Sequence, residues 1–335
     1  MRGAKALLLV SLLAFSLPVQ AQSSDVQRLL DSAAKNSVPA MIELGERYWD
    51  GNGVEVNIQK AWEWFKKAAE AGGPEEKHDY GIRVIELALH SDSVANEKEA
   101  FKWFSQAAEA NHVAAMASLA HCYRTGMGTA EDLTKAVSWY RKAAEKKHPD
   151  ALLALGELSE DGTGVEKSLA NAVYFFKLAA DHGSEEARFN LAFMYFDGRG
   201  VEKDEAKAIE LLKLAAKGEQ VDAQFELARC YAEGIGVEKN DVAAVKLFKK
   251  AVAQDHFEAR YYLAEHLYLG RGVDKSPVRA YALLYDLSAY DPDGNENSPV
   301  LQAAEKLAEK IEGEMTPEQF AEAEKIIAEE KPDEN

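Results

Sequence analysis

The chain repeats itself every 36 residues along most of its length. An alanine that opens an apolar pattern recurs at this interval, at Ala115, Ala151, Ala187, Ala223 and Ala259. A Gly-x-Gly pair recurs at Gly51/Gly53, Gly126/Gly128, Gly162/Gly164, Gly198/Gly200, Gly234/Gly236 and Gly270/Gly272. A fixed period of this size indicates a solenoid, in which each unit buries its apolar face only by stacking on its neighbours. The repeat thus predicts an architecture, and the function has to be argued from other residues.

Each unit reads as two helices joined by a glycine loop. Ala187, Leu191 and Tyr195 are spaced four apart and share one stripe of a first helix. The sixth position of the unit holds only Gly or Ala, which predicts that another helix passes close to it. Gly198 follows where a residue in the left-handed conformation would end the helix. A second helix then carries the pair Leu211–Leu212 between alanines, a pattern of large residues packed against small neighbours.

This pattern resembles the Sel-1-like repeat family, relatives of the tetratricopeptide repeat with a slightly longer unit. The resemblance rests on A-x3-LG/LA-x2-Y-x2-G-x-GV followed by A-x2-WF-x2-AA, and it covers about 38–288 in seven copies. It implies an all-α, right-handed α-solenoid of about seven helix-loop-helix repeats with helical caps. The second copy departs from the motif, because no Gly-x-Gly follows Tyr80-Gly81. A longer or differently shaped loop is expected within 87–96.

The segments outside the repeats have their own signals. Arg2 and Lys5 precede an apolar run that is too short to span a membrane and that ends at a small-residue cleavage site. We therefore expect a signal peptide that is cleaved after Ala21 and a mature chain that is periplasmic or secreted. The expected order is signal peptide 1–21, N-terminal capping helix 22–37, seven repeats 38–288, linker 289–299, C-terminal capping helices 300–330 and disordered tail 331–335.

The chain is strongly acidic. Its formal net charge is −18, and removal of Arg2 and Lys5 with the signal peptide makes it −20. Such a surface repels phosphate backbones, so neither nucleic acid nor an anionic membrane is an expected partner. The charge is interpreted either as a means of solubility or as a preference for basic partners.

Two short patterns are compatible with chemistry, and each has a structural alternative. The stretch from Ser32 to Lys35 matches the S-x-x-K motif of serine β-lactamases, but the partner S-D-N and K-T-G elements are absent. Residues 291–297 alternate oxygen ligands like a calcium loop, although Gly294 is at the fourth position instead of the sixth and Gln302 stands where a Glu is needed. A capping helix and a turn-rich linker are the preferred interpretations. We expect no catalytic residue, cofactor or metal.

Histidines and cysteines recur in fixed slots of the repeat. His112, His148 and His256 share one slot in the loop that ends a repeat, so no two of them are expected to meet around a metal. Cys122 and Cys230 share another slot, three repeats apart. With helices packed about 8–10 Å apart, three steps separate the two thiols by roughly 25–30 Å, whereas a disulfide needs Cα atoms within about 7 Å. Both thiols are expected to be free.

The candidate binding residues lie on the first helices of repeats five to seven. Positions four, seven and eleven of the unit fall opposite the packing stripe, and most of their occupants are polar. Phe193 and Tyr262 break that rule, and Asn190 and Arg229 lie beside them. Aromatic and arginine side chains on a solvated face are typical binding anchors. The alternative is that they cover a neighbouring repeat or the C-terminal helices.

The preferred functional hypothesis is a non-enzymatic exported scaffold that binds a protein partner along the concave face of a solenoid. The family resemblance implies roles such as envelope signalling, envelope assembly or host contact. The alternative is a β-lactamase-like or penicillin- or peptidoglycan-binding activity, which the resemblance attaches to some cysteine-rich members. Those members carry a disulfide in each repeat, and this chain, with two cysteines, does not.

Overall fold

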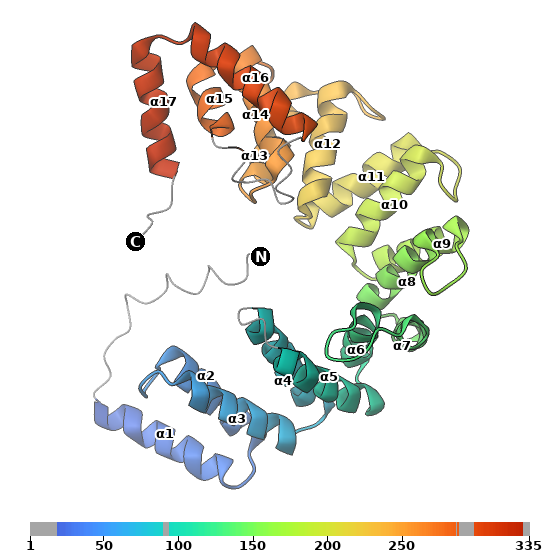
Figure 1. Cartoon of the computed structure of the whole chain (residues 1–335), viewed down its shortest axis with the longest axis vertical. Coiled ribbons are helices and arrows are strands. Elements are labelled where there is room, and N and C mark those ends of the chain that lie inside the picture. The colour runs from blue at the N-terminus through green and yellow to red at the C-terminus, as the bar shows by residue number, and fades with distance from the viewer. Residues whose placement is uncertain (1–18, 90–93, 286, 288–297, 331–335) are drawn as a thin grey trace. The chain divides into compact units, whose positions relative to one another are not determined.

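The protein is described here from a computed structural model, over residues 19–89, 94–285, 287 and 298–330 (Figure 1). Within those ranges the chain is helical and has no strand. The helices are α1 (Val19–Ala33), α2 (Val38–Asp50), α3 (Ile58–Ala71), α4 (Pro74–Leu89), α5 (Val94–Glu109), α6 (Val113–Thr125), α7 (Leu133–Glu145), α8 (Pro149–Asp161), α9 (Leu169–Asp181), α10 (Glu185–Asp197), α11 (Glu205–Lys217), α12 (Val221–Glu233), α13 (Asp241–Val252), α14 (Phe257–Leu269), α15 (Pro277–Leu284), α16 (Pro299–Glu314) and α17 (Pro317–Glu330). They form two compact units that meet in sequence between Lys146 and Lys147, and each unit is described by itself.

The helices pair as the 36-residue period predicts. In the first unit α2 packs on α3, α4 on α5 and α6 on α7, and in the second unit α8–α9, α10–α11, α12–α13 and α14–α15 pair in the same way (Figure 1). Within each unit every pair also contacts the following one. The predicted all-α repeat fold is therefore confirmed over the described residues, and we number the pairs from repeat one (α2, α3) to repeat seven (α14, α15).

The small residue at the sixth position makes room for a ring on the second helix of the same repeat. A methyl group on Gly81 would lie 2.6 Å from a ring carbon of Phe104, and one on Gly156 would lie 2.5 Å from a ring carbon of Phe176. Protein interiors tolerate no such overlap without displacement. The prediction that another helix passes too close for a larger side chain is correct, and the helix is the partner within the pair.

The two glycines of the loop have different tasks. Gly198 ends α10 with a left-handed φ of 68°, and its N–H donates to the Met194 carbonyl. Gly200 also has a positive φ, 72°, and a Cβ there would lie 2.5 Å from the carbonyl carbon of Leu169, at the start of α9. The second glycine thus lets the loop rest on the backbone of the preceding repeat.

The second repeat differs in helix length. Its helices α4 and α5 each have 16 residues, whereas α10 and α11 in repeat five each have 13. Because α4 has no glycine at the position where other first helices stop, it continues to Leu89. Part of the expected irregular loop, residues 90–93, lies outside the described residues.

Extra helices pack at both ends of the repeats. In the first unit α1 lies on α2, with Val26 and Ala33 in one cluster with Leu44. In the second unit α16 and α17 contact α15, and Leu301 and Ile311 are buried there. The prediction of helical caps is therefore confirmed. The predicted calcium-like stretch at 291–297 lies outside the described residues.

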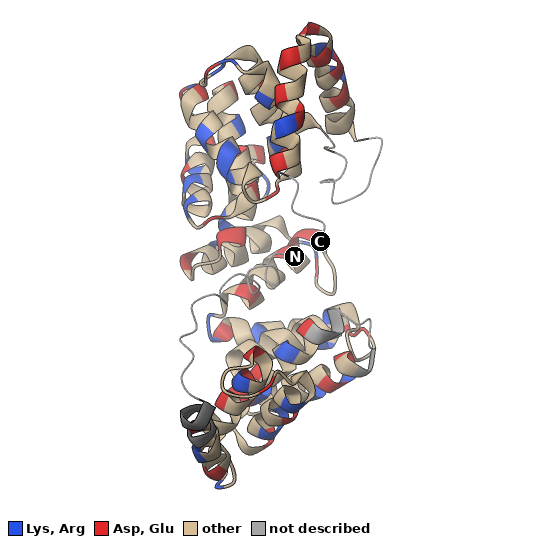
Figure 2. Ribbon diagram, turned by 90° about the vertical axis from the view of Figure 1, so that its left-hand side faces the viewer, with Lys and Arg blue, Asp and Glu red and all other residues tan. Residues whose placement is uncertain are grey.

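Acidic and basic side chains occur on the helices of both units, and the acidic excess is not confined to one segment (Figure 2). Among the residues that the structure describes, no helix has the length and apolar content needed to cross a membrane. Most of the expected signal peptide, residues 1–18, lies outside the described residues, and the expected cleavage site after Ala21 falls within α1.

Candidate partner-binding surface

The four predicted binding residues lie on three successive first helices of the second unit. Asn190 and Phe193 are on α10, Arg229 is on α12 and Tyr262 is on α14. All four are half-buried, so the expectation of a fully solvated face at positions four and seven is wrong for these repeats. A helical wheel treats one helix alone, whereas in the stack Tyr262 contacts Phe225 and Phe248 of repeat six. Arg229 in turn contacts Tyr262 of repeat seven.

Arg229 and Tyr262 both contact an aromatic residue, Phe225, that sequence analysis did not select. The guanidinium carbon of Arg229 lies 5.9 Å from the ring centroid of Phe225 and 5.9 Å from that of Tyr262. The same guanidinium contacts two carboxylates, Glu226 at 3.2 Å and Glu233 at 3.8 Å. Its position is thus fixed by both ring faces and negative charge, a combination suited to a planar cation.

Tyr262 also belongs to the core of its junction. Its ring stacks on Phe248 at a centroid distance of 5.7 Å and a tilt of 17°, and it meets Phe225 edge-on at 5.5 Å. Burial raises the pKa of the Tyr262 phenol and that of the Glu226 carboxyl. The alternative that this residue covers a neighbouring repeat therefore holds for one face of the ring.

Phe193 belongs to a separate aromatic group on α10. Its ring centroid lies 5.0 Å from that of Phe189 and 6.1 Å from that of Phe196, and all three rings are half-buried. Asn190 lies on the same helix, close to one turn before Phe193. The structure therefore arranges the predicted residues as two groups, one along α10 and one across α12 and α14.

Polar side chains at the second position of the unit form a feature that sequence analysis missed. Arg188 donates to the Ala180 carbonyl at 3.0 Å, and Gln224 donates to the Ala216 carbonyl at 3.3 Å. These carbonyls lie near the ends of α9 and α11, where each also accepts one bond from a backbone N–H in the turn that follows the helix. Gln254 in turn donates to the Gln224 side chain at 3.1 Å. A signal was present in the sequence, because the equivalent slot in repeats one, three and four holds Met41, Met116 and Leu152.

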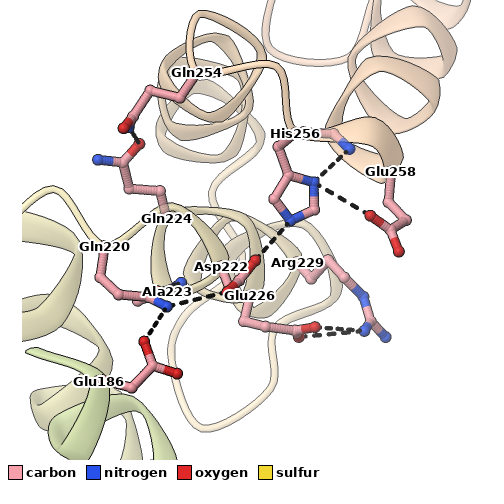
Figure 3. Close-up of polar contacts among 11 residues, drawn as sticks. Glu186, Gln220, Asp222, Ala223, Gln224, Glu226, Arg229, Gln254, His256 and Glu258 are labelled. Atoms are coloured by element: carbon pink, nitrogen blue, oxygen red, sulfur yellow. Dashed lines mark hydrogen bonds and ion pairs between the residues drawn. The ribbon is translucent and has the colours of Figure 1, made fainter. Parts of the chain in front are cut away.

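The slot shared by His112, His148 and His256 is the N-cap of a first helix, and not simply a loop. The Nδ1 atom of His112 accepts a hydrogen bond from Ala115 N–H at 3.2 Å, and His256 accepts one from Ala259 N–H at 3.2 Å (Figure 3). In repeat five the slot holds Ser184, whose hydroxyl oxygen caps Ala187 N–H at 3.1 Å. His148 makes no such side-chain bond. An oxygen or a nitrogen acceptor can therefore satisfy the same orphan donor.

The two cysteines are free and buried, as predicted. Burial raises the pKa of the Cys122 thiol to about 12 and that of the Cys230 thiol to about 11. In the part of the chain that the structure describes, no group of three His, Cys, Asp or Glu is placed to hold a metal ion. Ser32 lies in the last turn of α1, whereas Lys35 lies beyond the end of that helix and is exposed.

The stacked helix pairs, six of which have a first helix that ends at a left-handed glycine, define an α-helical repeat protein. The sequence model of the Sel1 repeat matches seven segments, 38–73, 89–112, 113–148, 149–184, 185–219, 221–256 and 257–285. The chain belongs to the Sel1 repeat family. The second match leaves out most of α4, the helix that lacks the glycine loop.

Comparison with solved structures found similar proteins, of which the first agrees with this assignment. A Sel1 repeat protein from Oxalobacter formigenes is 25% identical with a TM-score of 0.72, over 87% of this chain and 83% of that one. A protective antigen of uropathogenic Escherichia coli strains displaying an SLR fold is 22% identical with a TM-score of 0.46, over 93% and 91% of the two chains. No curated protein matches the chain.

Proposed function

We propose that this protein is a non-enzymatic scaffold that binds a protein partner through the α10–α14 surface, defined as Asn190, Phe193, Arg229 and Tyr262. The observation that carries the proposal is the Arg229 group, in which a guanidinium and a tyrosine ring are held in place and still half exposed. Tyrosine and arginine dominate the hot spots of protein interfaces, and anchors that are ordered before binding lose less conformational entropy. The Sel1 repeat fold, which commonly forms interaction scaffolds, supports the same function.

The chemistry around the anchors favours a basic partner segment with an apolar side chain. Glu226, Glu233 and Glu265 lie on the same helices as Arg229 and Tyr262, and the whole chain carries a net charge of −18. The rings of Phe189, Phe193 and Phe196 on α10 offer an apolar contact on the first helix of the preceding repeat. Complementary charge speeds association and excludes acidic competitors.

We also propose that the chain is exported. Arg2, Lys5, the apolar run that follows and the small-residue site before Gln22 support a cleaved signal peptide. Mass spectrometry of the purified native protein should find Gln22 at the N-terminus. Recovery of a chain that begins at Met1 would contradict export by this route.

Site-specific photo-crosslinking tests the binding surface. A photoreactive phenylalanine analogue at position 193 or 262 should capture one and the same partner from cells. The matched control carries the analogue at Tyr174 on the second helix α9, which is 59% exposed and outside the surface. Arg229→Ala should weaken binding of the captured partner by more than about 1 kcal/mol. Equal capture from position 174, or none from 193 and 262, would overturn the proposal.

The scaffold proposal also predicts that the purified chain does not hydrolyse nitrocefin. Burst or steady turnover of this β-lactam would support the alternative activity, and Ser32→Ala would then show whether the S-x-x-K stretch carries it.

A further inference from the structure

The cap of α14 is an imidazole held against carboxylates from two helices (Figure 3). Nδ1 of His256 accepts from Ala259 N–H at 3.2 Å and lies 3.4 Å from a carboxylate oxygen of Glu258. Nε2 lies 3.4 Å from a carboxylate oxygen of Asp222 on α12. The His256 side chain is only 8% exposed, so these contacts and not water determine its hydrogen bonding.

The contacts assign the neutral form of His256. A nitrogen that accepts from Ala259 N–H carries no proton, so the proton is on Nε2 and is donated to Asp222. This hydrogen bond from His256 lowers the pKa of the Asp222 carboxyl. In the neutral form the Glu258 carboxylate faces the Nδ1 lone pair, an arrangement of two acceptors with no proton between them.

Protonation reverses the role of Nδ1. An imidazolium has two donors and no acceptor, so it cannot cap Ala259 N–H, but it can donate to Glu258 as well as to Asp222. Glu226 on α12 also favours the charge, and the Phe225 ring lies 4.4 Å from the imidazole. The charge of Arg229 beyond Phe225 opposes it, as does the positive end of α14.

We propose that His256 is a proton-operated cap. When neutral it holds the first turn of α14, and when protonated it releases Ala259 N–H and pairs with Glu258 and Asp222. The movement reaches the α10–α14 surface through Phe225, whose ring contacts both the imidazole and Tyr262. Regulation of partner binding by this cap rests on the function proposed above, whereas the exchange of hydrogen bonds occurs in the isolated protein.

The same slot in two other repeats provides controls. Ser184 caps α10 with a hydroxyl, which does not titrate in the relevant pH range. His112 caps α6 as His256 caps α14. The centroid of its ring lies 4.9 Å from that of His78, so a protonated His112 faces another imidazole where His256 faces two carboxylates. The proposed exchange is therefore specific to α14.

Nuclear magnetic resonance of the mature chain tests the cap between about pH 8 and about pH 5, the range in which histidine titrates. Ring ¹⁵N shifts should report an Nε2–H tautomer at the upper end. Protonation of His256 should lower the protection of the Ala259 amide against exchange by about fivefold, corrected for intrinsic rates, as expected for one lost hydrogen bond. The Tyr262 ring signals should shift with the same midpoint.

Three variants sharpen the test. His256→Asn keeps a good N-cap without the titration and should abolish the pH response at Ala259 and Tyr262. Glu258→Gln should move the response to lower pH, because the imidazolium loses one carboxylate. His112→Asn should leave both signals unchanged. An Nδ1–H tautomer, or an Ala259 amide that ignores the titration, would overturn the cap. Failure of crosslinking at position 262 with the NMR response intact would instead remove only the link to binding.

Discussion

The junction of the first two repeats and the junctions of repeats four to six join equivalent helix pairs by different sets of contacts. Between α2 and α5 a row of aromatic rings meets edge to face. Trp49 lies 6.1 Å from Trp62, Trp62 lies 6.0 Å from Tyr80, and Tyr80 lies 5.4 Å from Trp103. Tyr80 and Trp103 are buried in the row, whereas Trp62 is half-buried and Trp49 is exposed. An ion pair between Lys66 and Glu99 at 2.8 Å joins the same two repeats.

Repeats four to six are joined by hydrogen bonds from side chains to backbone carbonyls, which we call carbonyl clamps. Arg188 and Gln224 reach carbonyls at the ends of α9 and α11, and Gln224, which is 1% exposed, also accepts from Gln254. Displacement of this buried amide would break two hydrogen bonds and lower the free energy of unfolding, because an unpaired polar group in the interior has lost its hydration without compensation.

The difference indicates that different repeats of one array can serve different ends. Some mainly bury aromatic surface, and others fix the orientation of neighbouring helices. Ring contacts give a large, weakly directional stabilisation, whereas a carbonyl clamp adds little net free energy and fixes which atoms face each other. The α10 and α12 part of the α10–α14 surface lies on clamped repeats. Tyr262 of repeat seven instead meets repeat six through ring contacts with Phe225 and Phe248.

The largest expected effect is loss of the central ring of the aromatic row. Trp62→Ala should destabilise the first unit by about 3 kcal/mol, since Trp62 contacts Trp49, Phe65 and Tyr80. Hydrogen exchange should show the loss in α3 and α4 and leave α12 unchanged. The exposed Tyr174→Ala in the second unit is the control, with a change within about 0.5 kcal/mol. A loss below about 1 kcal/mol for Trp62→Ala would show that the row is not what joins these repeats.

Removal of a clamp should cost less. Gln224→Ala deletes the amide that pairs with the Ala216 carbonyl and with Gln254, and it leaves a cavity, so about 2 kcal/mol should be lost from the second unit. Gln224→Met fills the slot as Met41 and Met116 do in repeats one and three, and it should lose about half as much. Chemical denaturation of the two variants decides the matter. If the Met variant is as stable as the native chain, the clamp contributes nothing to stability.

The fold could be predicted from the sequence because its signals are local or recur with the period. Gly198 and Gly200 mark a left-handed helix end and a close approach whatever surrounds them. The Gly or Ala of the sixth position could be interpreted without knowledge of Phe104 or Phe176, because only a close neighbour explains such a restriction.

The site could be predicted only in part because its contacts cross between repeats. Sequence analysis selected Tyr262 as an exception to a polar slot with Arg229 beside it, but it could not foresee that Phe225 contacts both. It placed His256 in a loop, since N-capping by an imidazole depends on a rotamer that no spacing encodes. It also treated positions four and seven as solvated, because the neighbouring helix that half-buries them does not appear on a wheel.

The two units can also be compared by the reactivity of their thiols, because Cys122 lies in the first unit and Cys230 in the second. Because the raised pKa is about 12 for Cys122 and about 11 for Cys230, the thiolate fraction at a given pH below both is larger at Cys230. Alkylation of the native protein near pH 8 should be slow at both sites and faster at Cys230. Mass spectrometry of the labelled peptides at timed intervals gives both rates. Faster labelling of Cys122 would mean that opening of the first unit, and not the thiolate fraction, limits the reaction.

The smallest effect on stability is expected at the most important anchor of the α10–α14 surface. Arg229→Met removes ion pairs to Glu226 and Glu233 that are partly open to water, and such pairs contribute about 0.2–1 kcal/mol each or less. The methionine side chain still covers Phe225 and Tyr262, which keeps the apolar contact. The free energy of unfolding should therefore change by no more than about 1 kcal/mol. Binding of the crosslinked partner should weaken by more than that, because the partner loses the hydrogen-bond donors of the planar guanidinium. If stability and binding weaken equally, Arg229 supports the junction between repeats six and seven. The binding surface must then be sought along the three phenylalanines of α10.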